Sequence, residues 1–209
     1  MKNKQISTLE LTEIAVLLAL VVSLQSISSF GVVNLCLCLV PITLGSVLLG
    51  WKRGGMLGFA FGVVAVFWGI VGKDAFTFFL FQANPIMTIL ICLVKGTMAG
   101  MIPAFAYDWL KKYNQLTASI VASVIAPVVN TGIFAIGCFL IKNDVLYSLT
   151  NIVPTEMAEQ IIGMSFFAVV FGVVITSNFF IELVINLIFA PSLNKVTEVV
   201  KKRIQIRKV

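Results

Sequence analysis

The sequence predicts an all-α membrane protein, a bundle of six transmembrane helices with both termini in the cytoplasm. Composition, the lengths of the apolar segments and the positions of the basic residues support this prediction. Of the 209 residues, 59% are apolar and 11% are charged, whereas a soluble domain carries about 25% charged residues. Six spans of roughly 20 residues each leave little chain for anything else. The composition therefore excludes a soluble enzyme and a transporter that carries its own nucleotide-hydrolysing module.

The first apolar stretch, from Ile14 to Trp51, is too long for one helix. It has 38 residues and would reach about 57 Å as a helix, nearly twice the thickness of a bilayer core. We expect the chain to fold back at the polar, glycine-ended segment 26–31. This gives the first two spans, at about 12–30 and 35–51.

Further apolar segments complete the six spans. Their approximate bounds are 54–72, 85–107, 115–141 and 161–190. Asn84 followed by Pro85 marks a helix start, because proline suits the first helical turn. Lys95 interrupts the segment that follows, which we still interpret as one helix. The whole chain, 1–209, is then a single membrane domain that ends in a basic cytoplasmic tail, 191–209.

The basic residues support this count of spans and give it an orientation. With both termini inside, 12 of the 15 Lys and Arg residues fall in cytoplasmic segments, and 2, Lys73 and Lys142, fall in outer loops. This bias follows the positive-inside rule, and an odd number of spans would scatter it. We interpret the basic tail as an anchor on the anionic inner leaflet and not as a nucleic-acid arm. Glu10 and Glu13 argue against a cleaved signal peptide.

Catalytic and metal-binding chemistry is not expected. The sequence has no histidine, which removes the commonest general base and the commonest metal ligand. The four cysteines lie in apolar runs without a Cys-x-x-Cys pair, so we expect them to behave as small hydrophobic residues. The sequence offers no activated nucleophile and no phosphate-binding glycine loop. We therefore predict that the protein is not an enzyme and holds neither a cofactor nor a metal.

Small residues recur at every fourth position, a pattern typical of membrane helices that pack closely. The most regular series runs through the third span, and we expect it to pack that span against its neighbours. Most of the series are expected inside the bundle, and one could face a partner subunit. The series are Gly50, Gly54, Gly58 and Gly62; Gly96 and Gly100; Ala118, Ala122 and Ala126; and Ala15 and Ala19.

Two ionisable residues are expected within the membrane, where such groups are expensive and often functional. One is Lys95, which lies near the midplane on a stripe with Thr88, Cys92 and Ala99. We expect this stripe to face away from lipid. The Lys95 amine could snorkel, pair with Glu182 or bind an anionic ligand.

The other ionisable residue, Glu182, belongs to a polar stripe on the sixth span with Asn178 and Asn186. Counted from the outer end of that predicted span, Glu182 lies roughly 32 Å down the axis, nearer the cytoplasm than Lys95. We therefore favour a structural or partner contact for Glu182 and regard Asn178 as the better ligand candidate.

The fifth span adds the polar residues Ser119, Ser123 and Asn130. Pro127 is expected to kink this helix and to free backbone carbonyls. Asn130, in the outer half, could donate to a substrate or to a neighbouring helix.

Two outer loops, 73–84 and 142–159, are longer than tight turns. The first contains four phenylalanines, which form either an interfacial aromatic belt or a lid over an outward-facing site. Two residues separate the second and third spans on the cytoplasmic side. Ligand capture is therefore expected at the outer face.

The order of proline and glycine through the second and third spans carries a family resemblance. After Asn34 the segment contains Pro41 and then Gly45, Gly50, Gly54, Gly58 and Gly62. With six short spans, the Asn84-Pro85 pair and the Ala15-x-x-x-Ala19 pair, this pattern resembles the substrate-binding (S) component of an energy-coupling factor (ECF) vitamin transporter. The resemblance covers nearly the whole chain, although the proline that the family usually has near residues 51–53 is absent.

The resemblance implies a small bundle in the bacterial cell membrane that captures a water-soluble vitamin at its outer face. It implies docking through the first span, at Ala15 and Ala19, onto a shared transmembrane scaffold subunit. Two cytoplasmic ATPase subunits then supply the energy. Binding residues in the family come mainly from the first outer loop, spans four to six and their outer connections. The candidates here are Asn34, Gln82, Asn84, Lys95, Asn130 and Asn178.

Pantothenate is the vitamin that these residues favour, because a desolvated lysine amine prefers an anionic partner and the amides suit hydroxyl and amide groups. Riboflavin, for which Trp68 and the phenylalanines offer stacking surface, and folate stay open as alternatives. From other classes, a non-transporting assembly subunit would use the polar residues only for packing. An autonomous carrier would show inverted internal repeats, and the sequence shows no convincing self-similarity.

Overall fold

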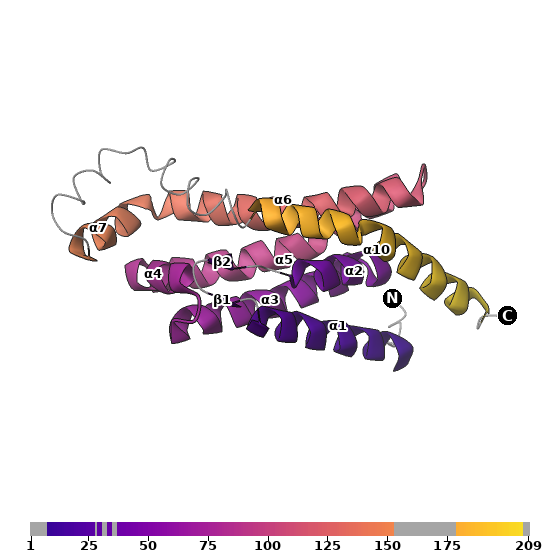
Figure 1. The fold of residues 1–209 in the computed structure, drawn as a ribbon, viewed down its shortest axis with the longest axis horizontal. Helices are drawn as coiled ribbons and strands as arrows, with labels where there is room; N and C mark the ends of the chain where they lie inside the picture. Colours follow the sequence, from indigo (N-terminus) through magenta and orange to yellow (C-terminus); the bar gives the residue numbers. More distant parts are fainter. Residues whose placement is uncertain (1–7, 28, 31–32, 35–36, 153–178, 207–209) are drawn as a thin grey trace, which may run out of the picture.

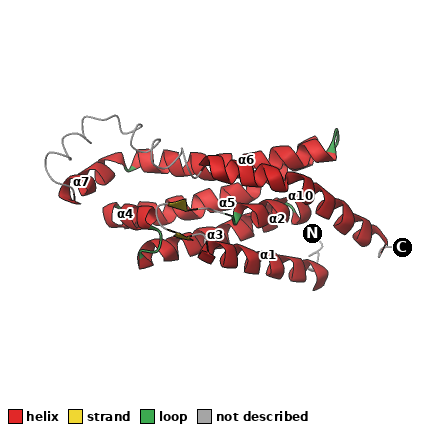
Figure 2. Cartoon of the chain, viewed as in Figure 1, coloured by secondary structure: helices red, strands yellow, loops and turns green. Residues whose placement is uncertain are grey.

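The structure is a computed structural model that describes residues 8–27, 29–30, 33–34, 37–152 and 179–206. Long helices lie side by side along one axis and form a bundle (Figure 1, Figure 2). Within the described ranges, five helices are long and apolar enough to cross a membrane. They are α1 (Thr8–Ile27), α3 (Trp51–Val71), α5 (Pro85–Leu110), α6 (Gln115–Leu140) and α10 (Phe180–Ile206). The chain is thus an all-helical multi-pass membrane protein apart from one very short strand pair, and the predicted count of six spans is not confirmed.

The second predicted span, 35–51, is shorter in the structure than the sequence suggested. It contains α2 (Leu39–Leu49), which has 11 residues and a length of only about 16 Å. Before it, β1 (Ser29–Phe30) and β2 (Val33–Asn34) form a two-residue antiparallel pair. Pro41 lies in the first turn of α2, where the N–H that proline lacks would have no partner within the helix.

The last helix also differs from the predicted span 161–190. Residues 161–178 lie outside the described part of the chain, and α10 begins at Phe180 and runs without interruption to Ile206. It passes through Pro191, so the first part of the predicted tail, 191–209, is helical. The apolar part of this helix, Phe180–Val200, extends beyond the predicted end of the span at residue 190.

The two predicted outer loops contain helices. The first holds α4 (Ala75–Ala83) and the second α7 (Lys142–Ile152). Asp74 caps α4 by accepting a hydrogen bond from the Thr77 amide, because an N-cap side chain satisfies amides that the first turn leaves unpaired. Asn84 caps α5 in the same way, which confirms the helix start predicted at Asn84-Pro85.

The bundle has two distinct ends. The beginning of α1 and the end of α10 lie together at one end, and α4 and α7 lie at the other (Figure 1). The first, here called the basic end, also carries the exposed Lys52 and the α5–α6 turn with Lys111 and Lys112. The second is here called the α4–α7 end. This arrangement agrees with the predicted clustering of basic residues, and the side of the membrane that each end faces stays a prediction.

Glycines bring α3 and α5 into backbone contact, and this glycine interface confirms the predicted series. A Cβ atom built at Gly58 would overlap the carbonyl oxygen of Gly96, and one built at Gly100 would overlap that of Gly54. Neither backbone can yield locally, because both belong to long helices. Gly50 does not take part: it has φ +85° at the junction between α2 and α3, a conformation that other residues rarely adopt.

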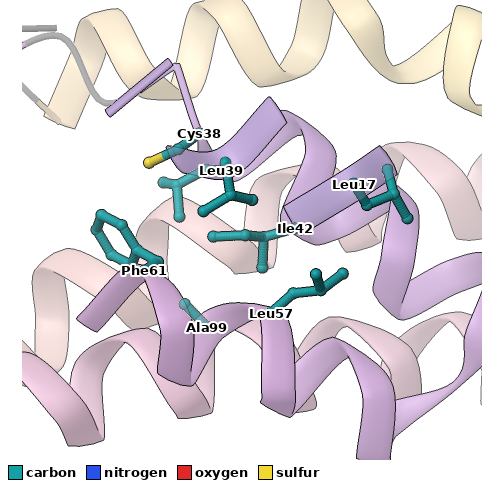
Figure 3. Close-up of a cluster of buried hydrophobic side chains, with 8 residues drawn as sticks. Leu17, Cys38, Leu39, Ile42, Leu57, Phe61 and Ala99 are labelled. Atoms are coloured by element: carbon teal, nitrogen blue, oxygen red, sulfur yellow. The ribbon is translucent and has the colours of Figure 1, made fainter. Parts of the chain in front are cut away.

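An apolar cluster next to this interface joins α1, α2, α3 and α5 (Figure 3). Only Leu17 and Val21 of α1 are buried, so α1 packs less extensively than the other long helices. Cys38 lies in the cluster as a small buried side chain, and Cys92 and Cys138 are buried and free of disulfides. These three confirm the hydrophobic role predicted for the cysteines. The cluster consists of Leu17, Val21, Cys38, Leu39, Ile42, Leu57, Phe61 and Ala99.

Candidate functional site

Lys95 lies inside the bundle, on the face of α5 that meets α6. Its Nζ atom is 4.1 Å from the centroid of the Phe134 ring, a geometry in which the ring quadrupole attracts the cation. The predicted stripe of Thr88, Cys92 and Ala99 is buried, as expected. Lys95 itself is half-buried. The amine is therefore directed toward the protein and not toward lipid.

Asn130 lies one helical turn from Phe134 on α6 and approaches the same region. The helices α5 and α6 pack antiparallel: Gly137 of α6 contacts Ile91 of α5, and Tyr107 of α5 lies among small residues of α6. This register places Asn130 at the level of the helical turn that follows Lys95. Asn130 is only 6% exposed. Its Oδ1 atom has no hydrogen-bond partner among the described residues. A buried acceptor of this kind is a natural contact for a ligand or an ordered water.

Phe134 connects this region to the α4–α7 end of the bundle. The Phe76 ring of α4 meets the Phe134 ring edge-on, with centroids 5.8 Å apart, and Leu80 of α4 is buried in the same cluster. The aromatic segment 73–84 therefore packs in part onto the bundle, above Lys95. Sequence reasoning missed Phe134, although its spacing of four residues from Asn130 places both on one helical face.

Glu182 lies in the first described turn of α10. Residues 161–178 of the predicted span lie outside the described part of the chain, so the depth predicted for Glu182 stays a prediction. Ser119 Oγ donates to Asn194 Oδ1 at 3.4 Å, and this contact sets the register between the antiparallel α6 and α10. From that contact, Asn130 is about 17 Å along α6 and Glu182 about 18 Å along α10 in the same direction. Glu182 is therefore level with Asn130, and it is buried.

Asn84 uses both ends of its amide in structural contacts. Oδ1 accepts a hydrogen bond from the Met87 amide at 3.1 Å, and Nδ2 donates to Asp144 Oδ2 at 2.7 Å. Asn84 thus joins the start of α5 to α7, at a distance of roughly 16 Å along the helix from Lys95. Gln82 is exposed on α4 nearby. The structure places Lys95 and Asn130 at neighbouring levels of α5 and α6, and it keeps Gln82 and Asn84 at the α4–α7 end.

The remaining candidates lie elsewhere. Asn34 belongs to β2, where its backbone pairs with Ser29. Asn178 lies outside the described residues. Ala15 and Ala19 are exposed on α1, on the face opposite the buried Leu17.

The fold and this site define a class: a multi-pass helical membrane protein with a cation and a buried amide held between its central helices. The comparison with protein families narrows the class. The sequence model of the substrate-specific component of ECF transporters matches residues 9–193. The chain belongs to this family, whose members are subunits of transporters and not enzymes.

The chain is also similar to a curated protein, the pantothenic acid transporter PanT of Lactococcus lactis subsp. cremoris (strain MG1363). The two are 23% identical over 167 residues, which cover 71% of this chain and 84% of the relative. No solved structure matches the chain.

Proposed function

We propose that this protein captures pantothenate at the outer face of a bacterial cell membrane and delivers it inward with an ATP-driven energising module. Family membership supports a substrate-binding role in vitamin transport, and the similarity to a pantothenic acid transporter supports this substrate. The observation that carries the proposal is the Lys95 amine, held on the Phe134 ring inside the bundle, while the buried Asn130 lies one helical turn from Phe134 on α6.

The chemistry of pantothenate fits these groups. A carboxylate would bind the Lys95 amine through a charge-assisted hydrogen bond, which is stronger inside the bundle than in water. A hydroxyl or amide N–H of the ligand would donate to Asn130 Oδ1, which no described residue satisfies. Asn34, Gln82 and Asn178 are proposed as further contacts toward the outer side. Asn84 is proposed to act by positioning α7 over α5, since its amide is already engaged.

The proposed orientation places the α4–α7 end outside and the basic end in the cytoplasm, following the positive-inside rule. In this orientation α4 and α7 lie on the outer side of Lys95. The exposed face of α1, with Ala15 and Ala19, is proposed to contact the transmembrane scaffold subunit of the module. Two cytoplasmic ATPase subunits complete the transporter.

A ligand screen on the purified protein tests the proposed substrate. Native mass spectrometry in detergent, first without added vitamin and then with pantothenate, riboflavin and folate, should show a bound mass equal to pantothenate. A riboflavin or folate mass would keep the S-component function and change its substrate. A protein that ignores the whole panel would favour a non-transporting assembly subunit.

Lys95→Met tests the residue on which the proposal depends. Removing one partner of a buried charge pair costs 2 kcal/mol or more, so pantothenate affinity should fall by at least ~30-fold. Lys52→Met is the matched control, because Lys52 also lies over an aromatic ring, Trp51, but at the basic end. The pantothenate affinity of Lys52→Met should equal that of the wild type. Equal affinities for wild type and Lys95→Met would contradict the role of Lys95.

A further inference from the structure

The last turn of α1 is attached to a distant part of the chain by a polar contact. Along the rest of its length α1 packs less extensively than the other long helices, since only Leu17 and Val21 are buried. At its end, the carbonyl oxygen of Ser26 accepts a hydrogen bond from Lys73 Nζ at 3.0 Å. Lys73 lies between α3 and α4, 47 residues further along the chain. The side chain of Lys73 therefore links the end of α1 to the connection between α3 and α4.

The backbone of Lys73 is fixed by the end of α3. Gly72 has φ +78°, a left-handed conformation that ends the helix, and the Lys73 amide donates to the Trp68 carbonyl at 2.9 Å. The side chain extends back over the Trp68 ring, with Nζ 3.9 Å from the ring centroid. A cation over the face of a tryptophan is attracted by the ring quadrupole. Trp68 therefore supports the ammonium group in the position from which it contacts α1.

The end of a helix is a favourable place for this cation. The last four carbonyls of α1 have no partner within the helix, and the helix dipole places partial negative charge there. The neighbouring carboxylate of Asp74 is engaged by α4, since it accepts hydrogen bonds from the Thr77 amide and hydroxyl at 3.3 Å and 2.6 Å. Lys73 is also one of the two basic residues predicted on the outer side, where the positive-inside rule disfavours them. Its contact with α1 gives this exception a structural reason.

The last turn of α1 leads into the β1–β2 hairpin, which carries the candidate Asn34. Each strand has two residues, and a hairpin of two strands is marginally stable at best without support. β1 begins three residues after Ser26. After β2 the chain returns to the same turn of α1, where Cys38 Sγ donates to Gln25 Oε1 at 3.1 Å. Both ends of the hairpin are therefore attached to the part of α1 that Lys73 holds.

We propose that Lys73 is a positioning residue for substrate binding: it caps α1 and thereby sets the position of the hairpin that carries Asn34. The substrate part of this inference rests on the proposed function, in which Asn34 contacts pantothenate. Lys73 acts without touching the ligand, because its ammonium group is engaged by Ser26 and Trp68. Removing the amine leaves the end of α1 uncapped and allows the hairpin to shift.

Hydrogen–deuterium exchange of the full-length protein in lipid nanodiscs tests the positioning without any ligand. In Lys73→Met, the backbone amides of β1 and β2 should exchange at least ~3-fold faster than in the wild type, because a marginal hairpin opens more often when its support is lost. Lys73→Arg should restore the wild-type rates, since a guanidinium group also donates and stacks on tryptophan. Lys142→Met is the matched control: Lys142 lies at the same end of the bundle, with Nζ 5.0 Å from the Phe139 ring centroid. The hairpin of Lys142→Met should exchange as in the wild type.

A double-mutant cycle on pantothenate affinity separates positioning from general destabilisation. Asn34→Ala and Lys73→Met should each weaken binding by about 5-fold, the effect of one lost hydrogen bond. The double variant should also bind about 5-fold more weakly than the wild type, because the second substitution removes a contact that the first has already disrupted. Lys95→Met should keep its full effect in the Lys73→Met background, since Lys95 does not lie on the hairpin.

Faster exchange of the hairpin in Lys73→Met, together with the non-additive affinities, supports the proposal. Wild-type exchange in Lys73→Met overturns it, and so does an additive loss of about 25-fold in the double variant. A wild-type protein that binds no pantothenate contradicts the proposed function and, with it, the substrate part of the inference. The exchange rates then still decide whether Lys73 holds the hairpin.

Discussion

Two helix contacts in the bundle are built differently: α3 and α5 meet through their backbones at the glycine interface, whereas α6 and α10 meet through side chains, some of them polar. In the glycine interface, Gly54 and Gly58 meet Gly100 and Gly96 backbone to backbone. In the contact between α6 and α10, Ser119 Oγ donates to Asn194 Oδ1 at 3.4 Å, and the buried Ser123 Oγ of α6 has no hydrogen-bond partner among the described residues. Backbone contact excludes water and fixes two helices relative to each other. Side-chain contact between two helices depends on the hydrogen bonds that the side chains form, and each such bond contributes about 1 kcal/mol.

α5 connects the two kinds of contact. Lys95 and Gly96 are neighbours in sequence, yet Gly96 packs on Gly58 of α3 while Lys95 reaches the Phe134 ring of α6. The rigid contact therefore holds the backbone from which the proposed substrate-binding amine extends. This arrangement preorganises Lys95, which lowers the entropy that a ligand must overcome on binding.

The largest expected effect comes from a side chain placed in the glycine interface. Gly58→Val would drive a branched side chain into the Gly96 carbonyl, and overpacking of a site that cannot relax destabilises by about 3 kcal/mol or more. SDS titration of the purified protein should show a large loss of unfolding free energy, or the variant should fail to purify as a monodisperse species.

Gly132→Ala is the control for this substitution. No atom lies within 4 Å of a Cβ built at Gly132, and alanine is the better helix former by about 1 kcal/mol. This variant should be as stable as the wild type or slightly more stable. A Gly58→Val protein with wild-type stability would show that α3 and α5 are not held by backbone contact. The glycine interface would then not differ in this respect from the contact between α6 and α10.

A smaller effect is expected when one buried serine hydroxyl is removed near the glycine interface, at Ser46, or from α6, at Ser123. Ser46→Ala deletes a hydroxyl that donates to a buried carbonyl, either Ile42 or Gly100, and should lower the unfolding free energy by about 1 kcal/mol. Ser123→Ala deletes a hydroxyl with no partner among the described residues. Its effect should stay within about 0.5 kcal/mol, because no hydrogen bond to a described residue is lost. Equal losses in the two variants would indicate a hidden protein partner for Ser123.

Helical periodicity and helix-start signals allowed much of the fold to be predicted. The Asn84-Pro85 pair marked the start of α5, and the glycine series of the third and fourth spans proved to be two sides of one interface. The second span, predicted over 35–51, contains an 11-residue helix, Leu39–Leu49, and the short strand pair of β1 and β2 precedes it. Apolar character alone could not tell an 11-residue helix preceded by extended chain from a complete span.

The candidate site was predictable only residue by residue. A charge in an apolar helix singled out Lys95, and a polar residue in the next span singled out Asn130. Phe134 was missed because a phenylalanine is common in a membrane helix, and its spacing of four residues from Asn130 was the one signal that could have found it. The depth of Glu182 was counted from residue 161, and it stays a prediction because residues 153–178 lie outside the described part of the chain.

The smallest loss of unfolding free energy is expected at the partly exposed ion pair between α1 and α3, because neither backbone contact nor full burial strengthens it. Arg53 Nη2 of α3 and Glu10 Oε1 of α1 are 2.7 Å apart, with side chains 30% and 27% exposed. Ion pairs near the surface contribute 0–1 kcal/mol, so Glu10→Gln should reduce the unfolding free energy by about 0.5 kcal/mol. Asp108→Asn, which breaks the exposed Lys111–Asp108 pair within α5, is the control and should have an equally small effect. If Glu10→Gln proves several times more destabilising than Asp108→Asn, the ion pair holds α1 in place, and helix attachment in this bundle depends on charge at the basic end as well as on packing inside.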